Sequence, residues 1–269
     1  MARISFVSTA VDTGVPFTET AMEKAIAAAP GGVSFCLLPQ LDAATPAKSW
    51  SPVEGGRRIV RDRVNPGRAF VAPTAAASPA LIANAAGSRA ALRATAVSQH
   101  RMIANSSGLK LNLASGWLLI VAAYRGVAGT SYILGSPKTT GADLVPNLVV
   151  STSGPTEYHR LMKGDVTVRL SETAPSDLGS TFHSFLWTWD TTTGFHLWVD
   201  GLPRTLSAAD TAGFTDGEFG LFNRATVYGD IDLACLAHGP LSLSGEAYSG
   251  YRGNLLSTVG AECGLGVGG

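Results

Sequence analysis

The sequence contains little charge, and the charge that it has is balanced. Only 15% of the 269 residues are charged, and 20 basic residues offset 20 acidic ones, so the formal net charge is zero. A broad electrostatic attraction to nucleic acid or to an anionic membrane is therefore not expected. The sequence also has no run of eighteen apolar residues, so we expect no membrane-spanning helix.

Cysteine is scarce, and no C-x-x-C pair occurs among Cys36, Cys235 and Cys263. An odd number of cysteines at this spacing favours neither a disulfide framework nor a zinc site, so we expect buried free thiols in a reducing compartment.

The opening MARISFVSTAVDTG lacks a long apolar core and is not expected to act as a secretory signal. The five histidines occur singly, and no Gly-x-Ser-x-Gly motif of a serine esterase is present.

Residues 1–32 differ from the rest of the chain. In TAMEKAIAAAPGG, Thr20 and Glu23 have the spacing of a capping box, alanine favours helix, and the Pro-Gly-Gly run ends the element. The pattern predicts a short helix over about 21–29. A helix of this length is marginal alone, so we expect it to dock on a partner surface.

The apolar side of that helix includes Met22 and Ile26 at helical spacing. It is expected to dock either on the same chain or on a neighbouring chain. We favour the neighbour, and Met22 and Ile26 are then partner-binding residues.

From Ser88 onward the pattern is typical of short β-strands. Segments such as RAALRATAV, WLLIVAAYRG and YGDIDLACLAHG are apolar or alternating, and Gly, Asn, Asp, Ser or Pro separates them. Regular short strands with turn signals predict a β-sandwich or barrel. The preceding segment, Val71–Gly87, is rich in alanine, and its Ser78-Pro79 pair favours a helical turn.

The stretch FLWTWDTTTGFHLWVDG, residues 185–201, predicts a hairpin with two different faces. Side chains alternate between the faces of a strand. The opposite face mixes His, Trp, Asp and Thr, a composition seen on solvated faces and in shallow ligand sites. The uniformly apolar face is expected to be core, and it comprises Phe185, Trp187, Trp189, Phe195, Leu197 and Val199.

On the mixed face, Trp198 is the candidate ligand-binding residue. An outward aromatic ring near His196, Asp200 and Asp190 has the composition that stacks and hydrogen-bonds sugar rings. These four residues are the candidate glycan site. The alternative, which the sequence favours, is that Trp198 packs under a neighbouring loop or a second layer.

Three stretches, in this order and spacing, resemble the concanavalin A-like superfamily in its laminin G-like jelly-roll branch. They are SPALIANAAGSRAALRAT at 78–95, the hairpin at 185–201 with its apolar-x-V-D-G ending, and YGDIDLACLAHGPLSLSGEAYSGYRGNLLSTVG at 228–260. The family usually has Phe where this chain has Ala94. The resemblance implies an all-β fold, a jelly-roll sandwich of two antiparallel sheets with six or seven strands each.

That superfamily includes glycan lectins, glycoside hydrolases, adhesion modules and parts of bacteriophage particles. The absence of an export signal, the helix ahead of the β domain, the neutral charge and the free thiols favour a virion component. The expected function is therefore a non-enzymatic bacteriophage structural protein, a capsid decoration or a head or tail fibre component, that displays a lectin-like domain for surface or glycan binding. The alternatives are a bacterial polysaccharide-binding module and a glycan-cleaving enzyme.

The enzyme alternative has little support in the residues. The glucanases of the superfamily carry Glu-x-Asp-x-x-Glu on one strand, whose alternating carboxylates share one face. The nearest stretch here is GDIDLA, in which Asp230 and Asp232 share a face but both glutamates are missing. No catalytic residue is assigned, and no organic cofactor is expected.

Calcium binding is another property found in the superfamily. It needs several oxygen ligands that converge from loops. Asp200, Asp216 and Asp230 stand at strand ends or turns and are the candidate metal ligands. An Asp before a Gly is also a common turn former, so the sequence leaves both interpretations open.

A basic run lies in GGRRIVRDRVNPGR. It either contacts phosphate or an acidic partner, or it forms a solvated edge strand whose charges prevent aggregation. No aromatic residues interleave with it to stack nucleic-acid bases. The arginines are Arg57, Arg58, Arg61, Arg63 and Arg68.

The sequence thus predicts three parts. Residues 1–32 form an arm and anchoring helix, 33–260 the jelly-roll domain, and 261–269 a loose C-terminal tail. The expected partners are other virion proteins, reached through the N-terminal segment, and a cell-surface glycan. A homo-oligomer remains open, and the expected location is the virion, assembled in the host cytoplasm.

Overall fold

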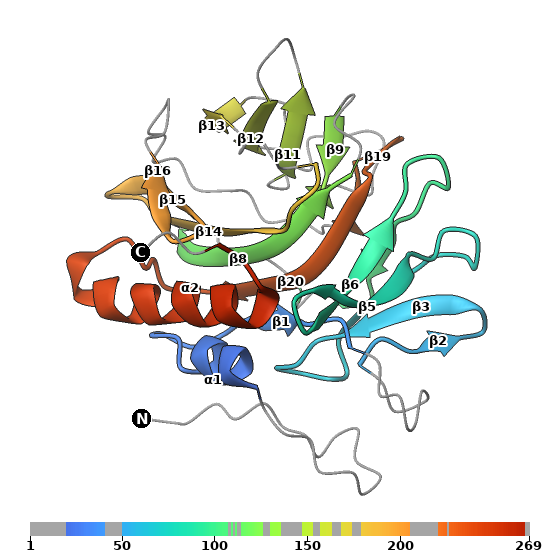
Figure 1. Ribbon diagram of the computed structural model, residues 1–269, viewed down its shortest axis with the longest axis horizontal. Helices are drawn as coiled ribbons and strands as arrows, with labels where there is room; N and C mark the ends of the chain where they lie inside the picture. Colours follow the sequence, from blue (N-terminus) through green and yellow to red (C-terminus); the bar gives the residue numbers. More distant parts are fainter. Residues whose placement is uncertain are drawn as a thin grey trace, which may run out of the picture.

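The protein is a β-sandwich with a layer of two helices on the outside of its larger sheet (Figure 1). The all-β class expected from the sequence is confirmed. The computed structural model describes residues 20–40, 50–106, 109, 111, 114–125, 130–135, 147–152, 157–162, 168–173, 179–204, 220–224 and 226–266. The expected extended arm at the N-terminus and the candidate ligand Asp216 lie outside these residues.

Within the described residues the larger sheet has eight strands, all paired antiparallel. β1 (Phe35–Leu37) extends it at the edge of β20, beyond the end of β6. The order of the others is β16 (Leu202–Arg204), β15 (Gly194–Val199), β14 (His183–Asp190), β8 (Ser115–Tyr124), β20 (Ile231–Gly239), β6 (Arg89–Ala94) and β5 (Ala80–Ala86).

The second sheet, again within the described part of the chain, has six strands. Their order is β10 (Leu134–Gly135), β17 (Gly220–Leu221), β7 (Met102–Ala104), β4 (Ala69–Val71), β3 (Arg57–Arg61) and β2 (Val53–Glu54). A further sheet runs β13 (Val168–Thr173), β12 (Glu157–Met162), β11 (Asn147–Thr152), β9 (Thr130–Tyr132), and a short ladder joins β18 (Asn223–Arg224) to β19 (Val227–Tyr228).

The central strand β8 contributes to two cores. Its even-numbered side chains, from Leu118 to Tyr124, enter the core between the two larger sheets, together with Phe70 and Met102 of the second sheet. Its odd-numbered side chains, from Trp117 to Ala123, enter a second core under the helices. Strand alternation therefore makes this sheet the middle layer of the molecule, apolar on both faces.

The predicted core face of the 185–201 hairpin is confirmed. All six of its side chains belong to the core between the sheets, and each is at most 5% exposed. Full burial of side chains this large stabilises the fold by about 1.5–3 kcal/mol each.

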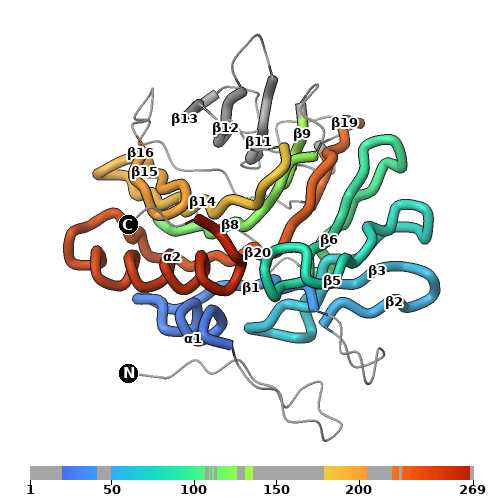
Figure 2. The backbone as a smooth tube through the Cα atoms, in the orientation of Figure 1, coloured from blue at the N-terminus to red at the C-terminus, as the bar shows by residue number. Residues whose placement is uncertain are grey.

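The helical layer consists of α1 (Ala21–Ala27) and α2 (Ser249–Cys263), preceded by a 3₁₀ turn at Glu246–Tyr248. Figures 1 and 2 show α2 running along the larger sheet, with α1 beside it. The Tyr251 hydroxyl donates a hydrogen bond of 3.0 Å to the Ala25 carbonyl and links the helices. In the described part of the chain, no helix has both the length and the apolar character that crossing a membrane requires.

Helix α1 forms as predicted but docks on its own chain. The capping box is present, since Thr20 and Glu23 exchange side-chain and backbone hydrogen bonds. Met22 and Ile26, expected to bind a partner, are 0% exposed in the second core, and the Met22 N–H donates to Glu262 of α2 at 3.0 Å. The expectation of a neighbouring chain is corrected, because α2 covers the apolar stripe that the sequence leaves unpartnered.

Two local expectations also need correction. The segment after Ser78-Pro79 forms strand β5, not a helical turn, because pairing with β6 outweighs the helix propensity of its alanines. At the other end of the chain, α2 runs to Cys263, so the expected loose tail is helical where it begins. Gly264 ends the helix in the left-handed conformation at φ 66°, and Leu265 is buried.

The three cysteines are free and buried, as the sequence predicts. Burial is the main reason that the pKa of each thiol is raised. Because the thiolate is the reactive form, these thiols contribute to packing and are chemically inert in the folded protein.

Most arginines of the basic run bind other residues of the fold. Arg63 is 0% exposed, its guanidinium carbon lies 4.1 Å from the Trp50 ring centre, and it forms an ion pair of 3.4 Å with Glu23. Three other arginines bind near neighbours, Arg58 to Ser51, Arg61 to Glu54 and Arg68 to Asp62. The run therefore stabilises the structure more than it offers free charge to a partner.

Candidate functional site

The mixed face of the 185–201 hairpin lies next to α2. The rings of His196 and Trp198 stack with their centres 6.1 Å apart, and the Arg252 guanidinium carbon of α2 lies 4.4 Å from the Trp198 ring centre. Trp198 packs against the second core and is only partly exposed. The structure thus places Trp198 under a second layer, which was one of the two interpretations that the sequence left open.

Asp190 and Asp200 do not converge on Trp198. Asp190 pairs with Gly194 at the start of β15 and Asp200 follows its end, so about 20 Å of strand separates them, six residues at about 3.3 Å each. Asp200, at φ 50°, binds the His183 ring at 2.6 Å and the Ser184 N–H at 2.8 Å.

Asp190 organises the turn of the hairpin. Burial raises its pKa, but hydrogen bonds from Thr193, Thr192 and Ser242 outweigh burial and bring the pKa to about 2. The carboxylate is therefore charged at neutral pH and committed to the turn.

The candidate metal ligands are also dispersed. Asp230 accepts a hydrogen bond of 2.7 Å from the Ala96 N–H, and Asp200 is held by His183 and Ser184 as described. No three His, Cys, Asp or Glu side chains among the described residues gather into a group that would hold a metal ion. Calcium binding stays a prediction, since Asp216 lies outside those residues.

The acidic pair of GDIDLA does not form an open catalytic face. Asp232 is 0% exposed and accepts hydrogen bonds from Arg93, at 2.9 and 2.8 Å, and from Arg125. Its oxygens are thus occupied by two guanidinium groups and are not exposed to a substrate.

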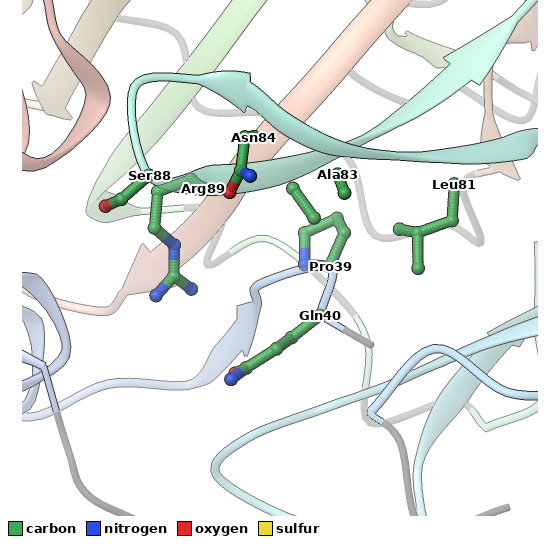
Figure 3. A pocket seen from close by; sticks show the side chains of 8 residues that line it. Pro39, Gln40, Leu81, Ala83, Asn84, Ser88 and Arg89 are labelled. Atoms are coloured by element: carbon green, nitrogen blue, oxygen red, sulfur yellow. The ribbon is translucent and has the colours of Figure 1, made fainter. Parts of the chain in front are cut away.

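A cavity of about 200 Å³ lies elsewhere, under the hairpin formed by β5 and β6 (Figure 3). We call it the hairpin cavity. In Figure 3 the side chains of Leu81, Asn84 and Arg89 extend from the hairpin toward the side of the cavity on which Gln40 lies. Its lining residues are Pro39, Gln40, Leu81, Ala83, Asn84, Ser88, Arg89 and Ala90.

The cavity lies where β20 of the larger sheet changes its pairing partner from β6 to β1. β20 pairs with β6 along Ile231–Leu233 and then with β1 along Leu236–His238. Pro39 and Gln40 lie two and three residues after the end of β1, and Arg89 is the first residue of β6, so the two strands diverge beside this point. The opening thus lies where strand pairing changes, and the loop residues Pro39 and Gln40 form part of its wall.

The hairpin itself is shaped by a β-bulge and by its turn. The register between β5 and β6 shifts between Ile82 and Ala86, and within that bulge Asn84 adopts a left-handed backbone at φ 49°. Bulges re-aim side chains, and left-handed non-glycine residues are enriched at functional sites. Gly87, at φ 55°, packs closely against the end of α2. A Cβ at this position would lie 2.6 Å from the Glu262 carbonyl oxygen.

Arg89 is the charged residue among the described residues of the lining, and it is 5% exposed. Its Nη1 lies 3.0 Å from Glu262 Oε1, whereas its Nη2 lies 3.9 Å from Glu23 Oε1, beyond hydrogen-bonding distance. Its Nε and Nη2 have no hydrogen-bond partner among the described residues. Both atoms are fully buried, and the guanidinium group is directed at Glu23 and Glu262, so Arg89 closes one end of the cavity without exposing these donors to it.

The charges around Arg89 are balanced. Glu23 and Glu262 face Arg89 and Arg63, two of each sign. Burial lowers the pKa of Arg63 to about 9, which still leaves it protonated at neutral pH. The described residues of the lining add amide groups, a hydroxyl and apolar carbons, so the hairpin cavity suits the recognition of a small polar molecule.

The comparisons with known proteins define the fold. No protein-family profile matches the chain, and no curated protein sequence matches it. Similar solved structures include the binding domain of Paraclostridial mosquitocidal protein 1 (9% identity, TM-score 0.55, 83% of this chain and 51% of that one) and the receptor binding domain of botulinum neurotoxin type G (10%, 0.51, 84% and 51%). Another is the sialidase of Trypanosoma rangeli in complex with a difluoro-KDN ligand (12%, 0.50, 85% and 33%).

This chain therefore spans about half the length of the two binding-domain structures and a third of the sialidase. At such low identity the likeness shows the fold alone, a β-sandwich compatible with the jelly roll expected from the sequence.

The sequence did not single out the residues of the hairpin cavity. Arg89 stood in a segment predicted as an ordinary strand, and Asn84 in a segment predicted as a helical turn. The usable signal was the pair Asn84 and Gly87, two residue types that tolerate a left-handed backbone, four positions into an otherwise apolar strand.

Proposed function

We propose that this chain is a non-enzymatic binding module whose hairpin cavity takes one sugar unit of a cell-surface glycan. The observation that carries the proposal is the lining, where neutral amide and hydroxyl groups from Gln40, Asn84 and Ser88 lie beside apolar carbons. Several fixed donors and acceptors beside apolar carbons suit a polyhydroxylated ring.

The size of the cavity supports a small ligand. Pockets for drug-sized molecules measure about 300–1,000 Å³, and about 200 Å³ leaves room for a single ring with its substituents. At about 0.3 kcal/mol per heavy atom, a sugar with about 15 heavy atoms would bind with a Kd near 1 mM. Display in several copies would raise such an affinity into useful avidity.

The non-enzymatic part of the proposal rests on the described lining of the hairpin cavity, whose residues include no carboxylate and no histidine. A glycosidase needs two carboxyl groups on opposite sides of the scissile bond. Two of the similar structures are described as binding domains, which agrees with a role in attachment. Release of reducing sugar from a polysaccharide bound in the cavity would contradict this part.

The virion location stays a prediction from the sequence. Anchoring through the stripe of Met22 and Ile26 would require α1 to leave the core, so a particle-bound form would attach through another surface. Mass spectrometry of purified particles from a producing host tests the location directly.

A glycan array with matched variants tests the binding function. Ala83→Leu places three further carbons in the hairpin cavity, whereas Ala80→Leu adds the same group to an exposed position of β5 that does not line it. The proposal predicts that wild type and Ala80→Leu bind the same glycans and that Ala83→Leu binds none of them. Equal binding by both variants would place the site elsewhere.

A further inference from the structure

The exposed wall of the hairpin cavity is held by the last turn of α2. The N–H and the hydroxyl of Ser88 both donate to the Glu262 carbonyl oxygen at 3.3 Å, and Gly87 packs closely against the same turn. Figures 1 and 2 show the turn between β5 and β6 at the end of α2. Asn84, Gly87 and Ser88 are exposed to solvent, so the tip of the hairpin keeps its position through these contacts and its own strand pairing.

The carboxylate of Glu262 joins two other segments of the chain. Its Oε1 accepts a hydrogen bond of 3.0 Å from Nη1 of Arg89, the first residue of β6. Its Oε2 accepts a hydrogen bond of 3.0 Å from the N–H of Met22, in the first turn of α1. Each oxygen thus binds a different segment, and a single side chain connects α1 to the hairpin that lines the cavity.

A second link between α1 and the hairpin runs through Glu23. This residue of α1 is 1% exposed, and its Oε1 lies 3.4 Å from Arg63 and 3.9 Å from Arg89. If α1 left its place, both buried guanidinium groups would lose this counter-charge. Removing one partner of a buried charge network is strongly unfavourable, so undocking of α1 favours a rearrangement of Arg89 and of the hairpin that carries it.

We propose that Glu262 is the positioning residue of the hairpin cavity and that docking of α1 holds the cavity in its binding form. Glu262 does not line the cavity but acts through Ser88 and Arg89, which do. The effect on ligand affinity rests on the proposed function, whereas the link between α1 and the hairpin does not. Because coupling between two sites is reciprocal, a glycan in the cavity stabilises docked α1, and a partner that drew out Met22 and Ile26 would weaken glycan binding.

Native-state hydrogen exchange of the ligand-free protein tests the link. Ile26→Ala weakens the docking of α1 from inside the core, and Lys24→Ala on the exposed side of the same helix is its control. Ile26→Ala should speed exchange of both the Met22 and the Ser88 amide by at least about tenfold, because an amide exchanges when its segment opens. Amides of the central strand β8 report global unfolding and serve as the reference, and Lys24→Ala should change neither amide.

Glu262→Gln separates the link from the docking of α1. The single oxygen of an amide group cannot accept from the Met22 N–H and from Arg89 in the way that the two carboxylate oxygens do. The effect of Ile26→Ala on exchange in the hairpin should therefore fall at least about threefold in the double variant, as expected for coupled residues. Glu246→Gln, at an exposed position ahead of α2, removes the same charge and is the control.

Hydrogen exchange in the presence of a ligand tests the positioning role. The probe is the glycan that binds most tightly on the array, at ten times its Kd. If opening of α1 disrupts the cavity, the glycan should slow exchange of the Met22 amide about tenfold, because it binds only the docked form. The amide of Gly56, in the exposed turn between β2 and β3, should be unaffected, and Glu262→Gln should reduce the protection of Met22.

The outcomes are distinct even if Glu262→Gln does not fold, because Ile26→Ala decides on the link alone. Faster exchange at Met22 without a change at Ser88 beyond that of β8 would overturn the link. A glycan that binds in the cavity, as shown by its sensitivity to Ala83→Leu, but leaves exchange at Met22 unchanged would overturn the positioning role. If no glycan binds there, the proposed function and the positioning role fail together, and the ligand-free exchange still shows whether α1 holds the hairpin.

Discussion

Replacing Ile26 with alanine tests whether α1 belongs to the core of this chain. Ile26 is 0% exposed and packs with Met22, Leu255 and Val259 in the core under the helices. Removing three buried carbons costs the transfer free energy of those atoms plus the energy of the remaining cavity, about 2–5 kcal/mol for Ile to Ala. With an m-value near 3 kcal/mol per M, a loss of 3 kcal/mol lowers the urea midpoint by about 1 M.

The matched control is Lys24→Ala on the exposed side of the same helix. Both substitutions place alanine in α1, so helix propensity changes little and in the same direction. Surface substitutions usually change stability by no more than about 0.5 kcal/mol. If Ile26→Ala and Lys24→Ala unfold at the same urea concentration, α1 does not dock on its own chain, and its apolar stripe is free for a partner.

Three further predictions follow from buried groups. Burial lowers the pKa of His238 from 6.5 to about 4, so the unfolded chain binds more protons between these values; stability should fall by about 3 kcal/mol as pH drops from 6.5 to 4 in urea titrations, and a His238→Gln variant should lack this part of the slope. Gly87→Ala should lower the melting temperature more than Gly55→Ala, because both have φ near 55° but only at Gly87 would a Cβ meet backbone atoms; equal losses would mean that the contact with α2 is not formed. The thiols should react with a thiol reagent only after unfolding, and rapid labelling of the native protein would contradict their burial at Cys36, Cys235 and Cys263.

The parts of the fold that sequence reasoning predicted are governed by local periodicity. The alternation of side chains across residues 185–201 identified the buried face of a hairpin. Only one of its two faces was uniformly apolar. The capping box at Thr20 and Glu23 located the start of α1 for the same local reason.

The opposite face of that hairpin could not be read in the same way. The sequence left the surroundings of Trp198 and His196 open, because the residues near them on that face are polar. In the structure, α2 packs beside them. The apolar residues of α2, such as Leu255, Leu256 and Val259, are interspersed with Gly, Ser, Thr and Asn, so the sequence indicated only a helical turn there and not a covering layer.

The hairpin cavity depends on contacts between distant parts of the chain. Gln40 follows β1, Asn84 and Arg89 come from the β5–β6 hairpin, and Glu262 stands near the end of α2, more than 170 positions from Arg89. No local pattern brings these segments together, and the bulge that holds Asn84 in its left-handed backbone is a property of the strand pairing.

The most direct test of the binding site is an amide and side-chain NMR titration of the isotopically labelled protein with the tightest glycan from the array. The account predicts the largest chemical-shift changes at the Asn84 and Ser88 amides. Largest changes at Trp198 and His196, with the β5–β6 hairpin unaffected, would contradict it.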